Sequence, residues 1–221
     1  MLSESVSLSV GAQEIQGDLR VPDEAIGVVV FAHGSGSSRL STRNRAVAEV
    51  FEGRRLGTLL LDLLTPEEER ADVATAEFRF DIPRLAGRVV QACDWLVARA
   101  NLTALPLGCF GASTGAAAAL IAAAERPDIV RAVVSRGGRP DLASDALPNV
   151  NAPTLLIVGG ADREVIVLNR QAMAQMRTQV ELAIVPAATH LFEEPGALAQ
   201  VATLAGNWFT SHLQGRFSRH A

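Results

Sequence analysis

Short runs of apolar, largely β-branched residues recur along the chain and alternate with segments of helical period. Such runs lie at 27–32, 57–64, 106–111, 129–134, 154–158 and 180–185. Between them, apolar residues return at helical spacing in 44–55, 81–100, 114–125, 165–176 and 196–212. Strands that are apolar throughout are usually covered on both faces, as in parallel sheets. The alternation therefore predicts an α/β fold with a doubly wound, mostly parallel sheet.

The beginning of the chain has a different pattern. Residues 6–10 alternate apolar and polar side chains, Gly11 follows, and a second extended stretch covers 15–21. This pattern indicates an N-terminal antiparallel hairpin. Two later stretches, 65–80 and 136–152, fit neither period. Both follow strands, so we expect them to form the rim of a pocket at the carboxyl edge of the sheet, with the acidic run at 67–69 as a solvated loop or first helical turn.

The 221 residues are expected to form one domain, 1–221, because no linker or internal repeat divides the chain. Hydrophobic residues make up 48% of the sequence, which is enough for a sizeable core. The longest purely apolar run, 116–124, is much shorter than the roughly 20 residues of a membrane-spanning helix. No insertion is long enough to form a separate lid.

Charge and composition exclude several classes of function. A net charge of -4 argues against nucleic acid and anionic membranes as partners. All 20 basic residues are arginines, so no lysine-dependent mechanism is available. The histidines and cysteines have no metal-ligand spacing, and we expect no metal and no cofactor. Without a readable secretory signal we expect a cytoplasmic location, where Cys93 and Cys109 stay reduced.

The most specific motif is Gly-Ala-Ser-Thr-Gly at 111–115, which places Ser113 between an apolar strand and an alanine-rich helix. GxSxG in this context is typical of a nucleophile elbow, where small neighbours allow a tight turn that projects the serine hydroxyl above the sheet. Serine is also a favoured helix N-cap, which is the structural alternative. We favour a nucleophile because suitable partners follow in the chain.

A serine nucleophile needs a histidine base and an acid, which in this type of fold follow in the order Ser, Asp or Glu, His. Asp162 follows a strand and a glycine turn, and His190 follows a later strand. Asp162 could instead cap the next helix, and Asp141 is a rival acid after the preceding strand. His212 and His220 are expected to be solvated tail residues.

Acyl transfer also needs N–H donors for the oxyanion of its tetrahedral intermediate. The expected donors are the backbone N–H of Thr114, directly after the nucleophile, and that of Ser35, in the loop after the first parallel strand. The loop sequence Gly-Ser-Gly-Ser-Ser at 34–38 could alternatively cradle a phosphate. It fails the dinucleotide pattern GxGxxG, because Arg39 stands where the third glycine belongs.

Segments 33–39, 111–115, 159–162 and 188–196 together resemble the α/β-hydrolase superfamily. More narrowly, the chain resembles the small dienelactone-hydrolase-like branch, members of which also occur fused to phosphoribosyltransferase domains. The resemblance spans nearly the whole chain and implies a triad of Ser113, Asp162 and His190 that hydrolyses a carboxylic ester or lactone. Dienelactone hydrolases resemble one another in a cysteine nucleophile and a glutamate near the oxyanion loop. Both are absent here, which argues against dienelactone itself as substrate.

We therefore expect a serine hydrolase of carboxylesterase type that acts on small-molecule esters or lactones through an acyl-enzyme on Ser113. Two alternatives stay open: a catalytically silent ligand-binding module of the same fold, and a nucleotide-binding oxidoreductase. The sequence indicates no oligomeric state. Four arginines are expected near the rim of the pocket, where we interpret them as solvated side chains rather than as groups that attract an acidic substrate: Arg39, Arg43, Arg136 and Arg139.

Overall fold

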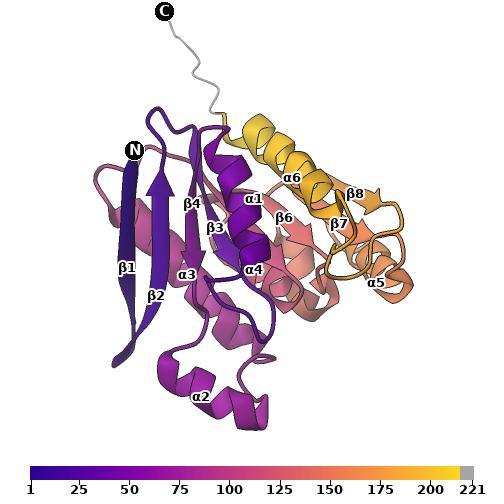
Figure 1. The fold of residues 1–221 in the computed structure, drawn as a ribbon, viewed down its shortest axis with the longest axis horizontal. Coiled ribbons are helices and arrows are strands. Elements are labelled where there is room, and N and C mark those ends of the chain that lie inside the picture. Colours follow the sequence, from indigo (N-terminus) through magenta and orange to yellow (C-terminus); the bar gives the residue numbers. More distant parts are fainter. Residues whose placement is uncertain (215–221) are drawn as a thin grey trace, which may run out of the picture.

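An eight-stranded sheet forms the centre of the computed structural model, which describes residues 1–214 (Figure 1). The strand order is β1-β2-β4-β3-β5-β6-β7-β8. Strands β1, β2 and β4 pair antiparallel, and every other pairing is parallel. This arrangement confirms the predicted fold class, including the N-terminal hairpin. The strands are β1 (Leu2–Val10), β2 (Gln13–Val21), β3 (Gly27–Ala32), β4 (Leu56–Leu61), β5 (Leu107–Ala112), β6 (Val130–Arg136), β7 (Thr154–Gly159) and β8 (Val180–Val185).

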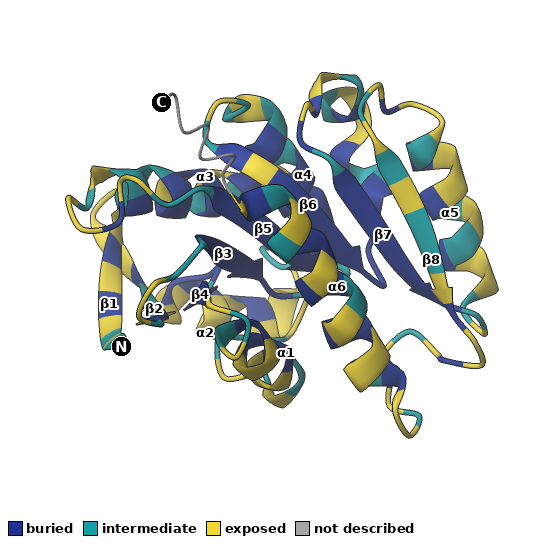
Figure 2. Cartoon of the chain, turned by 90° about the horizontal axis from the view of Figure 1, so that it is seen from above, coloured by how far each residue is buried: buried dark blue, intermediate teal, exposed yellow. Residues whose placement is uncertain are grey.

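Helices cover both faces of the sheet (Figure 2). Helices α1 (Thr42–Glu52) and α6 (Ala197–Leu213) pack on one face. Helices α3 (Ile82–Ala98), α4 (Thr114–Glu125) and α5 (Arg163–Met173) pack on the other, together with the 3-10 helix η1 (Pro140–Asn149). Helix α2 (Pro66–Thr75) lies beyond the end of the sheet (Figure 1). Among the described residues, no helix has both the length and the apolar character that crossing a membrane requires.

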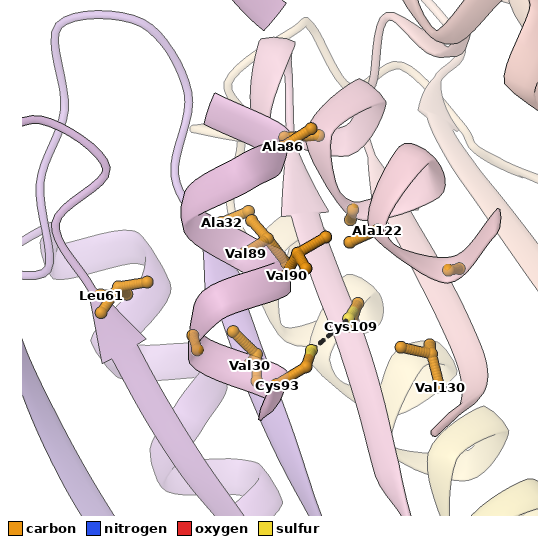
Figure 3. Packing of buried hydrophobic residues seen from close by; sticks show 14 of the residues in the cluster. Val30, Ala32, Leu61, Ala86, Val89, Val90, Cys93, Cys109, Ala122 and Val130 are labelled. Carbon is orange, nitrogen blue, oxygen red and sulfur yellow. Dashed lines mark hydrogen bonds between the residues drawn. The ribbon is translucent and has the colours of Figure 1, made fainter. Parts of the chain in front are cut away.

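The face under α3 and α4 is packed with aliphatic side chains and two thiols (Figure 3). Val89 and Cys93 of α3 lie over Val30 of β3 and Cys109 of β5. The sulfur atoms of Cys93 and Cys109 are 4.0 Å apart, and both residues are free and buried. The contact with Cys93, followed by burial, raises the pKa of the Cys109 thiol. These cysteines therefore behave as core residues.

The opposite face is held by an aromatic cluster. Phe31 of β3, Phe110 of β5, Phe51 of α1 and Phe209 of α6 are all buried. Their ring centroids are between 4.9 and 5.8 Å apart in tilted and edge-on pairs. Such pairs contribute beyond their buried area, so this cluster ties both covering helices to the two central strands.

The two stretches without a clear period are structured. Thr65 and Glu68 form a capping box that starts α2, so the acidic run is a first helical turn. The buried side of α2 is charged: Glu68 pairs with Arg84 and Arg88 of α3. A helix without an apolar stripe gives no helical period, which is why the pattern missed it. In the second stretch, 136–152, the first residue is the last residue of β6, and the 3-10 helix η1 follows.

The register of the parallel strands places their carboxyl ends along one edge. Ala32 at the end of β3 pairs with Leu61 of β4 and Gly111 of β5. Gly159 at the end of β7 pairs with Val185 of β8. The segments that follow β3, β5, β6, β7 and β8 therefore meet at the same edge of the sheet, where folds of this class bind ligands.

The aromatic cluster predicts a large stability difference between two phenylalanines. Phe51 is fully buried, whereas Phe80 is 60% exposed. We expect Phe51→Ala to lower the free energy of unfolding by about 3–5 kcal/mol, because it leaves a cavity among three aromatic rings. The matched change Phe80→Ala should shift it by about 0.5 kcal/mol or less. Urea unfolding followed by circular dichroism measures both, and similar losses in the two variants would contradict this view of the core.

Candidate active site

Ser113 lies at the turn between β5 and α4 with φ 50° and ψ -121°, a conformation that residues with side chains rarely adopt. Its N–H donates to the carbonyl of Arg136 at 3.3 Å, and its own carbonyl accepts the Arg139 N–H at 3.1 Å. These bonds hold the turn against the end of β6. Although Ser113 occupies the N-cap position of α4, its hydroxyl makes no capping hydrogen bond. The side chain is therefore free to interact elsewhere.

Two glycines make this turn possible. A Cβ atom at Gly115 would lie 2.2 Å from the carbonyl oxygen of Ala32, and one at Gly111 would lie 2.4 Å from the Cα of Ala116. Neither backbone can move aside without breaking the sheet or the helix. Only glycine at both positions lets α4 approach the strands this closely, and the close approach forces the sharp turn at Ser113.

Asp162 follows β7 and occupies the N-cap position of α5. Its side chain makes no capping hydrogen bond. Instead, its Oδ2 lies 2.7 Å from Nδ1 of His190. The backbone N–H of Asp162 donates to the carbonyl of Gly159 at 3.0 Å, which closes the turn and aims the carboxylate at the imidazole. A carboxylate in this position holds the proton of the imidazole on Nδ1 and leaves Nε2 as an acceptor.

His190 lies in the loop between β8 and α6, with 38% of its side chain exposed. Its Nε2 is 3.4 Å from the Oγ of Ser113. The adjacent N–H of Thr189 donates to the carboxylate of Glu194 at 3.0 Å, which helps to hold the loop. The three side chains thus form one chain of contacts, Asp162 to His190 to Ser113. The Oγ–Nε2 contact is at the long end of the hydrogen-bond range, as is common in sites without substrate.

The rival acid Asp141 is engaged elsewhere. Both of its carboxylate oxygens accept from Arg139, at 2.9 and 2.8 Å. The structure therefore brings Asp162, and not Asp141, to the imidazole of His190.

The loop after β3 is fixed by a buried histidine. His33 accepts the N–H of Leu63 on Nε2 at 3.0 Å, so Nδ1 carries the proton and lies 2.9 Å from the carbonyl of Gly34. Burial lowers the pKa of His33, which keeps its ring neutral. This histidine is a structural residue, because both ring nitrogens are occupied by the backbone.

The two expected oxyanion donors lie next to each other. The Ser35 hydroxyl is 3.0 Å from that of Thr114 and donates to the carbonyl of Arg79 at 3.3 Å. The contact between the two hydroxyls joins the loop after β3 to the first residue of α4. Within residues 1–214, no hydrogen bond occupies the backbone N–H of either Ser35 or Thr114. Both N–H groups therefore have no protein acceptor in this part of the chain.

A pocket of about 180 Å³ opens beside the turn at Ser113. Its walls come from the loop after β3, the start of α1, the ends of β5 and β6, and the loop that carries His190. The lining residues are Gly34, Ser35, Ser37, Ser41, Arg43, Ala112, Ser113, Arg136, His190 and Leu191.

The prediction of solvated rim arginines is wrong for Arg136, which is only 8% exposed and lines this pocket. It closes β6 and extends toward Asn44 of α1. Its place at the end of an apolar strand was the one sequence feature that could have indicated burial. The burial of Arg136 itself depends on α1, which is far away in the chain. The other rim arginines are paired: Arg39 with Asp62, Arg43 with Glu193 and Arg139 with Asp141.

His212 is not among the residues that line this pocket. His212 is half-buried and packs on Trp208, with ring centroids 4.2 Å apart, so the expectation of a solvated residue is wrong there. The reason is that α6 continues through it to Leu213. His220 lies outside the described residues. Across the part of the chain that the structure describes, no group of three or more potential metal-ligating side chains comes together.

The fold and the strained elbow at the edge of its sheet define an α/β hydrolase. The dienelactone hydrolase family model matches residues 22–209. The chain is 58% identical to a dienelactone hydrolase from Anabaena variabilis, with a TM-score of 0.93 over 96% of this chain and 98% of that one. Est1E from Butyrivibrio proteoclasticus has the same fold at 14% identity, with a TM-score of 0.79 over 96% of this chain and 99% of that one.

A curated relative from Mycobacterium tuberculosis, named "Putative phosphoribosyl transferase", is 56% identical over 212 residues. The match covers 96% of this chain and 47% of the relative, so the chain spans about half the length of that protein. The chain belongs to the dienelactone hydrolase family. This membership supports a hydrolase activity.

The conformation of Ser113 predicts an unusual effect of glycine. Glycine adopts positive φ without strain. We therefore expect the free energy of unfolding of Ser113→Gly to exceed that of Ser113→Ala by about 1 kcal/mol, which urea unfolding measures. Both variants remove the hydroxyl, so the comparison isolates the backbone. At Ser135, a buried strand position on β6, the same pair should rank in the opposite order. If alanine were the better residue at 113, the turn would not be strained.

Proposed function

We propose that this chain is a serine hydrolase that cleaves small carboxylic esters or lactones through an acyl-enzyme on Ser113. The proposal rests on one observation: the side chains of Ser113 and Asp162 both contact His190 instead of capping the helices that they begin. Three other helices, α1, α2 and α3, are capped in the ordinary way by the side chains of Ser41, Thr65 and Asp81. Serine and aspartate normally stabilise a helix by about 1 kcal/mol as caps, so their diversion to one imidazole favours a catalytic role.

The proposed reaction begins when Nε2 of His190 accepts the proton of the Ser113 hydroxyl as Oγ bonds to the carbonyl carbon of the ester. Asp162 stabilises the imidazolium that forms. The oxyanion of the tetrahedral intermediate accepts hydrogen bonds from the N–H groups of Ser35, in the loop after β3, and of Thr114, the first residue of α4. The bond to the leaving oxygen then breaks, and His190 returns the proton to that oxygen.

Water completes the cycle in the proposed mechanism. The oxygen of a water molecule attacks the acyl carbon while His190 accepts one of the water's protons, and a second tetrahedral intermediate forms. The bond to Ser113 breaks, the serine recovers its proton from His190, and the carboxylic acid leaves. A lactone would follow the same steps, with alcohol and acid remaining in one molecule. The small pocket favours compact acyl groups.

Two further inferences belong to this proposal. We infer that the chain works as one domain, since the triad comes from several elements of a continuous sheet. A cytoplasmic location, where the free thiols of Cys93 and Cys109 would stay reduced, is part of the same proposal.

A fluorophosphonate probe should label the protein at one residue, Ser113. Because labelling requires an activated hydroxyl, Ser113→Ala should abolish both the adduct and the hydrolysis of short p-nitrophenyl esters. The adduct is located by peptide mass spectrometry. Labelling that persists in Ser113→Ala would overturn the nucleophile, and a folded protein with neither labelling nor turnover would favour the silent ligand-binding module.

The acid is tested by two matched substitutions. We expect Asp162→Asn to lower kcat by about 10³–10⁴-fold, because an amide would favour the wrong tautomer of His190. Asp141→Asn removes a carboxylate whose one ion-pair partner within residues 1–214 is Arg139, and it should change kcat by about threefold or less. Steady-state kinetics on one ester compares them. Loss of turnover in Asp141→Asn alone would show that the acid is misassigned.

A further inference from the structure

Ser35, whose backbone N–H is one of the two expected oxyanion donors, lies exposed in a short turn after β3. The N–H of Ser37 donates to the carbonyl of Gly34 at 3.2 Å and closes this turn. Gly36 has a φ of 66°, as glycine does at the third position of a type II turn. A glycine allows many backbone conformations, whereas an oxyanion donor is effective only when its direction is fixed in advance. The direction of the Ser35 N–H therefore depends on contacts from outside the turn.

One such contact comes from the 76–81 loop, which joins α2 to α3. The Ser35 hydroxyl donates to the carbonyl of Arg79 at 3.3 Å and lies 3.0 Å from the hydroxyl of Thr114. Since a hydroxyl has one proton, Thr114 then donates to Ser35. The side chain of Arg79 also reaches the turn, because a Cβ atom added to Gly36 would lie 3.9 Å from its Nη1. Ser35 is thus held between the start of α4 and the 76–81 loop.

The 76–81 loop is itself held by Asp72 of α2, which is only 2% exposed. Its Oδ1 accepts the N–H groups of Phe78 and Arg79 at 2.7 and 2.9 Å, and its Oδ2 accepts from Nε of Arg79 at 2.7 Å. Its backbone carbonyl accepts from Nη2 of Arg79 at 2.8 Å. One residue therefore fixes both the backbone and the side chain of Arg79.

This network contributes geometry more than stability. A buried ion pair adds little net stability, because the cost of desolvation offsets the attraction between the charges. A fully satisfied buried network does hold its members in one arrangement. Both carboxylate oxygens of Asp72 are satisfied by the 76–81 loop, so the loop has one defined position. The carbonyl of Arg79 transmits that position to Ser35.

We propose that Asp72 is a positioning residue that acts through Arg79 and the Ser35 hydroxyl to fix the direction of the Ser35 N–H toward the oxyanion. This inference rests on the proposed hydrolase function. Loss of the Asp72 carboxylate releases the 76–81 loop, and the carbonyl of Arg79 no longer holds the serine. The effect falls on kcat rather than on KM, because the oxyanion exists in the transition state and not in the bound ester.

A double-mutant cycle tests this link. Asp72→Ala and Ser35→Ala cut the same series of contacts at its two ends, and Ser35→Ala keeps the backbone N–H. We expect each to lower kcat for p-nitrophenyl butyrate about tenfold with little change in KM, and the double variant to lie within about threefold of either. A double loss equal to the product of the single losses, or native kcat in Asp72→Ala, would overturn the proposal. If Asp72→Ala does not fold, Arg79→Gln takes its place, since it removes the ion pair and keeps the carbonyl.

Glu68→Ala is the matched control. Glu68 is a second buried carboxylate of α2, but it pairs with Arg84 and Arg88 of α3 instead of the 76–81 loop. We expect this variant to be less stable in urea and to keep kcat within about twofold of the native value. A loss of kcat in Glu68→Ala equal to that in Asp72→Ala would assign the effect to α2 as a whole and refute the specific role of Asp72.

Amide hydrogen exchange tests the same link without turnover. Mass spectrometry follows the peptide that contains 34–38 in the native protein, in Asp72→Ala and in Glu68→Ala. We expect faster exchange in Asp72→Ala alone, because a released turn opens the hydrogen bond between Ser37 and Gly34 more often. Native exchange in Asp72→Ala would refute the link. If the exchange difference were present but the native protein were not labelled by fluorophosphonate, the hydrolase function would be refuted instead.

Discussion

The close packing of α4 against the central strands is the constraint on which the rest of the site depends. A side chain at Gly115 would collide with the carbonyl of Ala32, so the helix begins almost in contact with the end of β3. That contact has two results. It forces the chain into the strained turn at Ser113, and it brings the loop that carries Ser35 beside Thr114. One steric requirement therefore places the candidate nucleophile and both candidate oxyanion donors.

Two histidines follow strands at this edge, and their surroundings give them opposite properties. His33 is buried with both ring nitrogens bonded to the backbone, so gaining a proton would break a hydrogen bond and charge a buried ring. His190 is partly exposed, has a carboxylate behind Nδ1 and directs Nε2 at a hydroxyl. Proton transfer needs a ring that can accept a charge and then release it, and only the second environment allows this.

The sequence predicted those features that depend on neighbouring residues. The period of the strands and the order of three motifs at strand ends were enough for the sheet and for the positions of Ser113, Asp162 and His190. Helix α2 was not predicted, because its buried side is made of ion pairs, which leave no apolar period in the sequence. The burial of Arg136 was not predicted either, because it depends on Asn44, which is 92 residues away in the chain. Contacts of this kind have no local signal.

A serine at the elbow makes different demands on the site from those of a cysteine. A thiol with a pKa near 8.5 is partly ionised before it attacks, whereas a serine hydroxyl must lose its proton during the attack. The base must therefore be oriented in advance, which the 2.7 Å contact between Asp162 and His190 provides. Cys93 and Cys109 cannot take over this role, because both are buried in the core beneath α3. In the proposed mechanism, nucleophilic attack at this edge therefore requires His190 to accept the proton of Ser113.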